Sequence, residues 1–223
     1  PSEVLETIWA LPNVTMIYGN TDIKLLKPSP PSAKKLARLD NKKAIKNILE
    51  DWQTTSWTIG ALAQGNWLSK IAELPLEYRT QLPDGTSVLL VHASPGEDNG
   101  QGLTPDLSKD EVRDLFSMAE ETLIFVGHKH AVQERFVDGK HIFNPGSIGK
   151  PVGKDVRASY AILEADEEDY SISAHYVAYD TEACIRELSA RYYPEPADLK
   201  KRFKLTDNHC KSFINRAIDQ SSR

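Results

Sequence analysis

The sequence predicts an α/β fold, because short apolar runs alternate with stretches of helical periodicity. Three runs of strand length, 14–18, 87–91 and 122–126, are each followed at once by glycine or histidine. Continuous apolar runs of this length are typical of strands buried on both faces of a sheet. Amphipathic spacing between the runs indicates helices that cover those faces.

Length, composition and charge fit one globular domain over residues 1–223. The chain is 40% hydrophobic and 26% charged, and no apolar run approaches the ~20 residues of a membrane helix. Its two cysteines make no disulfide pattern, so we expect a cytoplasmic protein with no membrane partner. The net charge of −5 argues against general nucleic-acid binding but leaves room for a local basic surface. The oligomeric state is not indicated.

The first part of the chain is predicted to be mainly helical. Helical spacing begins at once, in residues 2–10, and a helix already in progress at Pro1 leads us to expect further residues upstream. The strand at 14–18 follows. We interpret about 24–82 as a helical cap inserted between two strands, because periodic apolar residues continue through most of it.

The second part is predicted to contain most of the strands. Ser108 and Glu111 have the spacing of a capping box, so a helix should begin there and run to about Glu121. The other expected elements are a hairpin at 133–143 that turns at Asp138-Gly139, strands at 159–164 and 170–178, and a helical tail at about 181–223.

Polar side chains follow each of the three apolar runs. Asn20 comes after the first, His92 after the second, and His128 and His130 after the third. Because the carboxyl ends of neighbouring strands share one sheet edge, we expect these side chains to lie together. Asparagine oxygen and neutral imidazole suit borderline divalent ions. Taken singly, Asn20 is an ordinary turn residue and His92 an ordinary structural histidine, but their recurrence after three strands predicts a metal site.

Other notable side chains have simpler interpretations. The tryptophans of the cap could stack on a nucleobase, but their helical spacing favours the core. These are Trp52, Trp57 and Trp67. Three histidines without ligand-like neighbours should be exposed or hydrogen-bonded, namely His141, His175 and His209. The lysine pairs at 34–35, 42–43 and 200–201 should be solvated.

Four blocks of sequence extend this metal-site pattern. They are Gly19-Asn20-Thr21-Asp22, His92-Ala93, Gly127-His128-Lys129-His130 and Asn144-Pro145-Gly146-Ser147-Ile148-Gly149. In type and order they resemble the calcineurin-like metallophosphoesterase superfamily, in particular its small bacterial and archaeal phosphodiesterase-like branch. The resemblance covers residues 1 to about 180. It implies a two-sheet αββα sandwich and two divalent ions, of which Mn, Fe, Co, Ni and Zn all suit the ligands.

The resemblance also implies a role for each matching residue. Asn20, His92 and His128 would bind one ion, and His130 would bind the other. Asp22 would orient its neighbours without binding an ion itself. The Asn-Pro-Gly-Ser block would form a turn beneath the site, where a purely structural role is the simpler interpretation.

The chain departs from the family pattern in three places. The first two family blocks, Asp-x-His and Gly-Asp-x-x-Asp, are absent, although they supply ligands and the bridging carboxylate. We therefore expect the sequence to be N-terminally incomplete, with the ion pair complete only when upstream ligands are present. Thr21 stands where the family has a histidine that assists the leaving group. Lys129, where threonine is common, would meet a phosphate oxygen or point to solvent.

Three functions stay open. The first is a metal-dependent phosphodiesterase or phosphatase, in which a hydroxide bridging two ions attacks a phosphorylated small molecule or nucleotide. The second is a non-catalytic binding or scaffold protein that retains the fold. The third is a protein that binds one structural or regulatory ion. Residues upstream of Pro1 would discriminate among them.

Overall fold

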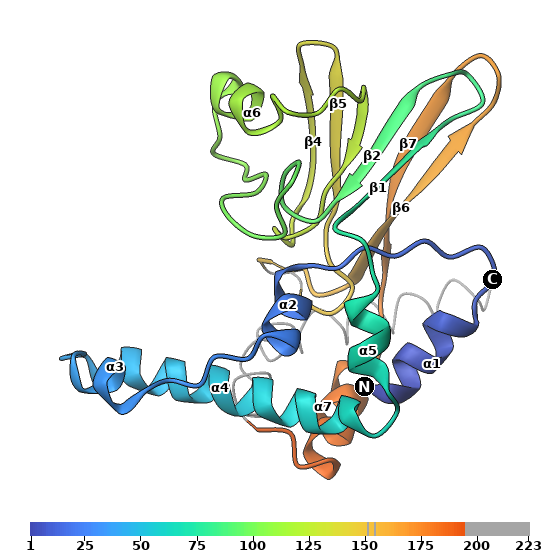
Figure 1. Ribbon diagram of the computed structural model, residues 1–223. Helices are drawn as coiled ribbons and strands as arrows, with labels where there is room; N and C mark the ends of the chain where they lie inside the picture. Colours follow the sequence, from blue (N-terminus) through green and yellow to red (C-terminus); the bar gives the residue numbers. More distant parts are fainter. Residues whose placement is uncertain (151, 154, 195–223) are drawn as a thin grey trace, which may run out of the picture.

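A computed structural model describes residues 1–150, 152–153 and 155–194 of the chain (Figure 1). Its main feature is a mixed five-stranded sheet in the order β1-β2-β3-β5-β4. The strands are β1 (Glu77–Gln81), β2 (Ser87–Val91), β3 (Leu123–Phe125), β4 (Val132–Val137) and β5 (Lys140–Pro145). The central strands β2, β3 and β5 are parallel, while the outer strands β1 and β4 pair antiparallel with their neighbours.

A second, smaller sheet completes the β structure. It consists of β6 (Ala158–Ala165) and β7 (Tyr170–Val177), paired antiparallel. A hydrogen bond of 2.9 Å between Nδ1 of His141 on β5 and the Tyr170 hydroxyl on β7 links the two sheets. The predicted α/β class with two sheets is confirmed. His141 is also hydrogen-bonded to Glu134, so its two ring nitrogens are both partnered, as the sequence predicts.

The core of the sheet half forms where the parallel strands meet α6 (Lys109–Leu115). Leu89, Ile124 and Ile142 come from the three central strands and are fully buried with Phe116. The capping box is confirmed, because the Ser108 hydroxyl accepts the Glu111 N–H. The helix ends earlier than the predicted residue 121. Phe116 already lies in the core, and the chain must turn beyond it to enter β3.

The hairpin of β4 and β5 turns at the predicted residues. Asp138 has φ 50° and Gly139 has φ 79°, the positive pair of a type I′ turn. Two other predictions need correction. Residues 14–18 are extended but join no described sheet, and Val14 is 40% exposed. An apolar run becomes a strand only with a ladder partner, and the backbone here is tied instead by the Tyr18 N–H to the Pro75 carbonyl, at 3.1 Å.

The second correction concerns the end of the helical cap. The expected insertion reached residue 82, but the helices end at Ala72, and residues 77–81 form the edge strand β1. This strand, Glu-Tyr-Arg-Thr-Gln, carries too few apolar residues to be recognised by its pattern, because an edge strand exposes most of its surface. The helices before β1 are α1 (Ser2–Ala10), α2 (Asn20–Leu26), α3 (Ala33–Ala37), α4 (Lys42–Ala63) and α5 (Trp67–Ala72), of which α3, α4 and α5 lie within the predicted cap.

The helical half has a small core of its own. Leu25, Leu62, Trp67 and Ile71 are buried together, and Trp9 of α1 meets Trp67 edge-on at 5.5 Å. Trp67 therefore has the predicted core role. α7 (Thr181–Ala190) begins the expected helical tail. The rest of that tail, with His209, Cys210 and the lysine pair 200–201, lies outside the described residues.

No helix within the described ranges is both long and apolar enough to cross a membrane.

Candidate metal centre

Asn20 and His92 come together from opposite halves of the molecule. Asn20 is the first residue of α2, and His92 follows β2. The His92 Nε2 lies 3.0 Å from the Asn20 Oδ1, so the ring donates a proton to the amide oxygen here. Gly19 makes this approach possible, because a Cβ at that position would lie 2.7 Å from the His92 ring.

His128 lies beside this pair on the tight turn that ends β3. Its ring is 5.3 Å from the His92 ring, centroid to centroid. The backbone has φ 55° at His128, and the Lys129 N–H donates to the Gly127 carbonyl at 2.5 Å. This is a γ-turn with positive φ, which is a strained conformation. The fold thus fixes the direction of His128 with backbone as well as side-chain contacts.

The hydrogen bond of His128 selects its tautomer. Its Nε2 lies 3.0 Å from the Gly100 carbonyl oxygen, which can only accept, so Nε2 carries the proton. In the neutral ring, Nδ1 is then the nitrogen available to a metal. Gly102 in the same loop has φ 59°, and a Cβ there would lie 2.8 Å from the His128 ring. Neither Gly100 nor Gly102 belongs to any of the four sequence blocks.

Asn144 supports the turn from beneath. It is fully buried, and its Nδ2 donates to the Gly127 carbonyl at 2.8 Å and to the Lys129 carbonyl at 2.5 Å. Its Oδ1 accepts the Gly146 N–H at 2.8 Å. The Asn-Pro-Gly-Ser block therefore holds the histidine turn in place. The expectation of a turn beneath the site fits this position, although the sequence did not single out Asn144.

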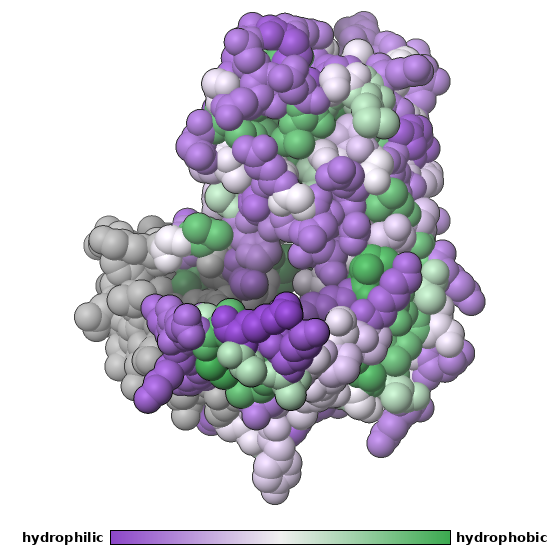
Figure 2. All heavy atoms as spheres, turned by 60° about the vertical axis from the view of Figure 1, so that its left-hand side comes forward, coloured by the Kyte–Doolittle hydropathy of each residue, from purple (hydrophilic) through white to green (hydrophobic). Residues whose placement is uncertain are grey.

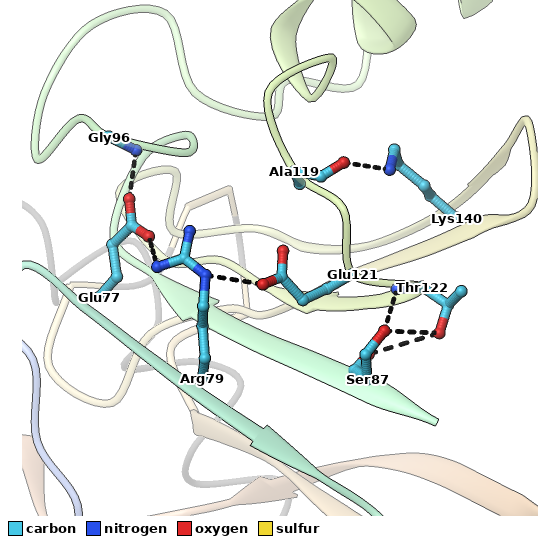
Figure 3. Close-up of polar contacts among 8 residues, drawn as sticks. All are labelled: Glu77, Arg79, Ser87, Gly96, Ala119, Glu121, Thr122 and Lys140. Carbon is cyan, nitrogen blue, oxygen red and sulfur yellow. Dashed lines mark hydrogen bonds and ion pairs between the residues drawn. The ribbon is translucent and has the colours of Figure 1, made fainter. Parts of the chain in front are cut away.

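The loop that follows His92 has a separate anchor on the edge strand (Figure 3). The Gly96 N–H donates to the Glu77 carboxylate on β1. Arg79 pairs with that carboxylate at 2.5 Å and with buried Glu121, just before β3, at 2.7 Å. Although β1 is exposed, these contacts tie it to the loop that follows His92 and to the residue that precedes β3.

The environment of His92 keeps its imidazole neutral. Burial disfavours the imidazolium and lowers the pKa of His92, and the neighbouring His128 and His130 lower it further. Asp22 and Asp98 oppose this shift in smaller measure. A metal ligand must offer a free nitrogen lone pair, so a lowered pKa suits that role.

The donors assembled here fit one divalent ion. An amide oxygen and two imidazoles are suitable ligands for borderline ions. A 3.0 Å separation between Asn20 Oδ1 and His92 Nε2 also matches two ligands of one ion at metal–ligand distances of about 2.1 Å. Asp22 instead accepts the Gly19 N–H at 2.8 Å, a contact that caps α2, and Thr21 is exposed.

The second ion of the predicted pair has no comparable set of donors. His130 is close enough to His92 to affect its pKa. Within the described ranges, however, no group of three or more His, Cys, Asp or Glu side chains is placed to hold an ion. The described part of the chain thus provides donors for one ion, and one of these donors is an asparagine rather than a carboxylate.

Comparison with known proteins identifies the family. Residues 1–168 match the calcineurin-like phosphoesterase superfamily domain, and the chain belongs to this superfamily. It is 29% identical over 210 residues to the uncharacterized protein MJ0912 of Methanocaldococcus jannaschii, covering 87% of this chain and 77% of the relative.

Two solved structures share the fold. The hypothetical protein PH1004 from Pyrococcus horikoshii OT3 has a TM-score of 0.69 at 19% identity, covering 90% of this chain and 76% of the other. A metallophosphoesterase from Sphaerobacter thermophilus has a TM-score of 0.67 at 23% identity, covering 91% and 81%. Family and fold support a phosphoesterase function in general terms, and the family generally uses divalent metals.

Proposed function

We propose that this protein is a metal-dependent phosphoesterase that acts on a phosphodiester or a phosphomonoester of a small molecule or nucleotide. The observation that carries the proposal is the 3.0 Å approach of Asn20 and His92 with the His128 ring beside them. These residues come from α2 and from the ends of β2 and β3, and their side chains lie near one another. Glycine at position 19 is needed for that convergence, which a merely structural histidine would not require.

The residues of the chain have separate tasks in this function. Asn20, His92 and His128 hold an ion, and His130 serves the other ion of a pair that needs further ligands. Divalent ions in such a site supply Lewis acidity and lower the pKa of water. Burial lowers the pKa of His92, and the histidines orient the site rather than move protons. Asn144 and Asp22 keep the ligands in position through the backbone N–H and carbonyl groups that they contact.

Thr21 bears on the choice between diesters and monoesters. A threonine hydroxyl does not supply a proton near neutral pH as an imidazolium does. Without that general acid, leaving groups that depart as stable anions should be favoured. Diesters with a good leaving group are therefore the better first substrates.

The test is a turnover assay of the full-length protein with added Mn²⁺. We expect hydrolysis of bis(4-nitrophenyl) phosphate that chelation removes and Mn²⁺ restores, and we expect slower hydrolysis of the monoester. His128→Ala should abolish both. Turnover that survives chelation or this substitution would overturn the proposal.

A non-catalytic binding protein is the second candidate. It is favoured by the lack of a three-member His, Cys, Asp or Glu group in the residues described. Such a protein would bind a single Mn²⁺ through Asn20, His92 and His128 and show no metal-dependent turnover. Calorimetric titration with Mn²⁺ beside the assay separates the two functions.

A further inference from the structure

The positive charge of the chain is concentrated in one segment that begins just after Asn20 of the candidate metal centre. Residues 24–46, the basic arm, contain eight lysines and arginines and one aspartate, a formal charge of +7, although the whole chain carries −5. The remainder therefore carries −12. The basic arm begins four residues after Asn20 and comprises the end of α2, a Pro-rich link, α3 and the start of α4.

Most cations of the basic arm have no acidic partner. Lys24 pairs with Asp51, and Lys46 pairs with Glu50 at 3.0 Å. The others form no ion pair with any residue that the structure describes, namely Lys27, Lys34, Lys35, Arg38, Lys42 and Lys43. Elsewhere the pattern differs, because Arg79, Arg113, Arg157 and Arg191 each pair with a carboxylate. All six unpaired side chains belong to exposed residues.

The shape of the molecule places these cations at the edge of an open space. α3 and the start of α4 project to one side of the molecule, away from the sheets (Figure 1). When that side is turned forward, a strongly hydrophilic surface lies along the rim of a hollow between the helical half and the sheet half (Figure 2). Six cations spread over residues 27–43 exceed what one small phosphate can contact.

The composition of the basic arm indicates what it contacts. Residues 24–46 contain no aromatic side chain, so they offer no platform on which a base could stack. Cations alone recognise backbone phosphates without regard to sequence. A membrane surface fits less well, because an interfacial helix exposes large apolar side chains. None of the exposed large apolar side chains within the described ranges belongs to this segment.

We propose that the basic arm binds the phosphate backbone of a single-stranded oligonucleotide and leads one of its phosphodiesters to the metal centre. This rests on the proposed phosphoesterase function and narrows its substrate to a phosphodiester strand. The negative charge of the remaining surface repels such a strand and confines it to the basic arm.

The experiment measures binding apart from catalysis. A fluorescein-labelled oligothymidylate of about 20 nucleotides is titrated with the full-length protein in EDTA, by anisotropy over a series of salt concentrations. If all six cations bind phosphates, the slope of log K against log salt is about −4.2. In the double variant Lys34→Ala/Lys35→Ala the slope should be shallower, about −2.8, and binding should weaken about 25-fold at about 0.1 M salt.

A matched control removes the same charge elsewhere. Lys109→Ala/Arg186→Ala takes two cations from α6 and α7 and should leave both slope and affinity unchanged. Any of three results would overturn the proposal. The two double variants could lose affinity equally, or the unaltered protein could fail to bind at low salt. The third is binding of phosphatidylserine vesicles instead of the oligonucleotide. Turnover of bis(4-nitrophenyl) phosphate, measured in parallel, should be the same in both variants. Its absence, with oligonucleotide binding intact, would refute only the phosphoesterase function.

Discussion

His92 and His128 belong to the sheet half of the site and Asn20 to the helical half, and the two halves are held by different contacts. On the sheet side, a buried core, a strained turn and the Asn144 hydrogen bonds fix the rings. On the helical side, Asn20 depends on the start of the short helix α2 and on its bond to His92. We therefore expect changes on the sheet side to affect catalysis most, and changes on the helical side to affect substrate binding most.

The largest effect should come from removing a ring on the sheet side. His92→Ala deletes a metal ligand and the partner of Asn20, and we expect Mn²⁺-dependent kcat/KM to fall more than about 100-fold. His175→Ala is the control, since that histidine lies on β7 of the small sheet and contacts Ser173 and Tyr160. Comparable losses in the two variants would show that the site is misplaced.

The next largest effect should come from a side chain that fills the space between the two halves. Gly19→Ala places a Cβ within 2.7 Å of the His92 ring, so the ring or α2 must move. We expect a loss of about 10- to 100-fold in Mn²⁺ affinity, measured by calorimetry. Gly60→Ala is the matched control in α4, where a new Cβ meets nothing within 4 Å. It should stabilise the protein by about 0.5–1 kcal/mol without changing affinity.

A smaller effect should come from removing the Asn144 hydrogen bonds that hold the histidine turn on the sheet side. Asn144→Ala removes three hydrogen bonds of a fully buried side chain, so the free energy of unfolding should fall by about 3 kcal/mol. Turnover should fall as well, because His128 loses its fixed direction. Asn41→Ala removes the N-cap of α4 and should cost about 1 kcal/mol. If the loss of activity were proportional to the loss of stability in both variants, Asn144 would have no role in the site beyond stabilising the fold.

The smallest effect should be the pH dependence of stability without metal. The pKa of folded His92 lies below its unfolded value near 6.5, chiefly because of burial. Between these two pKa values the unfolded chain binds more protons than the folded chain. The contribution of His92 to stability is therefore complete above about pH 6.5 and decreases as the pH falls. Urea unfolding in EDTA at about pH 7.5 and about pH 5.5 measures this. His92→Gln should reduce the difference, and an unchanged difference would contradict the assignment to His92.

Several elements could be predicted because their signal is local. The strand at 87–91 follows from a continuous apolar run, and the β4–β5 turn follows from Asp138-Gly139, which tolerate positive φ. Three contacts could not be predicted, because they join residues distant in sequence. They are the approach of Gly19 to His92, the packing of Gly102 on His128, and the support that Asn144 gives to the turn. The candidate ligands themselves were chosen by sequence, and their metal binding stays a prediction.

The central claim is that the two halves of the molecule share one ion, and anomalous X-ray diffraction from Mn²⁺-soaked crystals of the full-length protein tests it most directly. We predict a manganese peak within about 2.3 Å of Asn20 Oδ1, His92 Nε2 and a ring nitrogen of His128. A peak bound by other residues, or a manganese ion that leaves the Asn20–His92 hydrogen bond in place, would contradict the account.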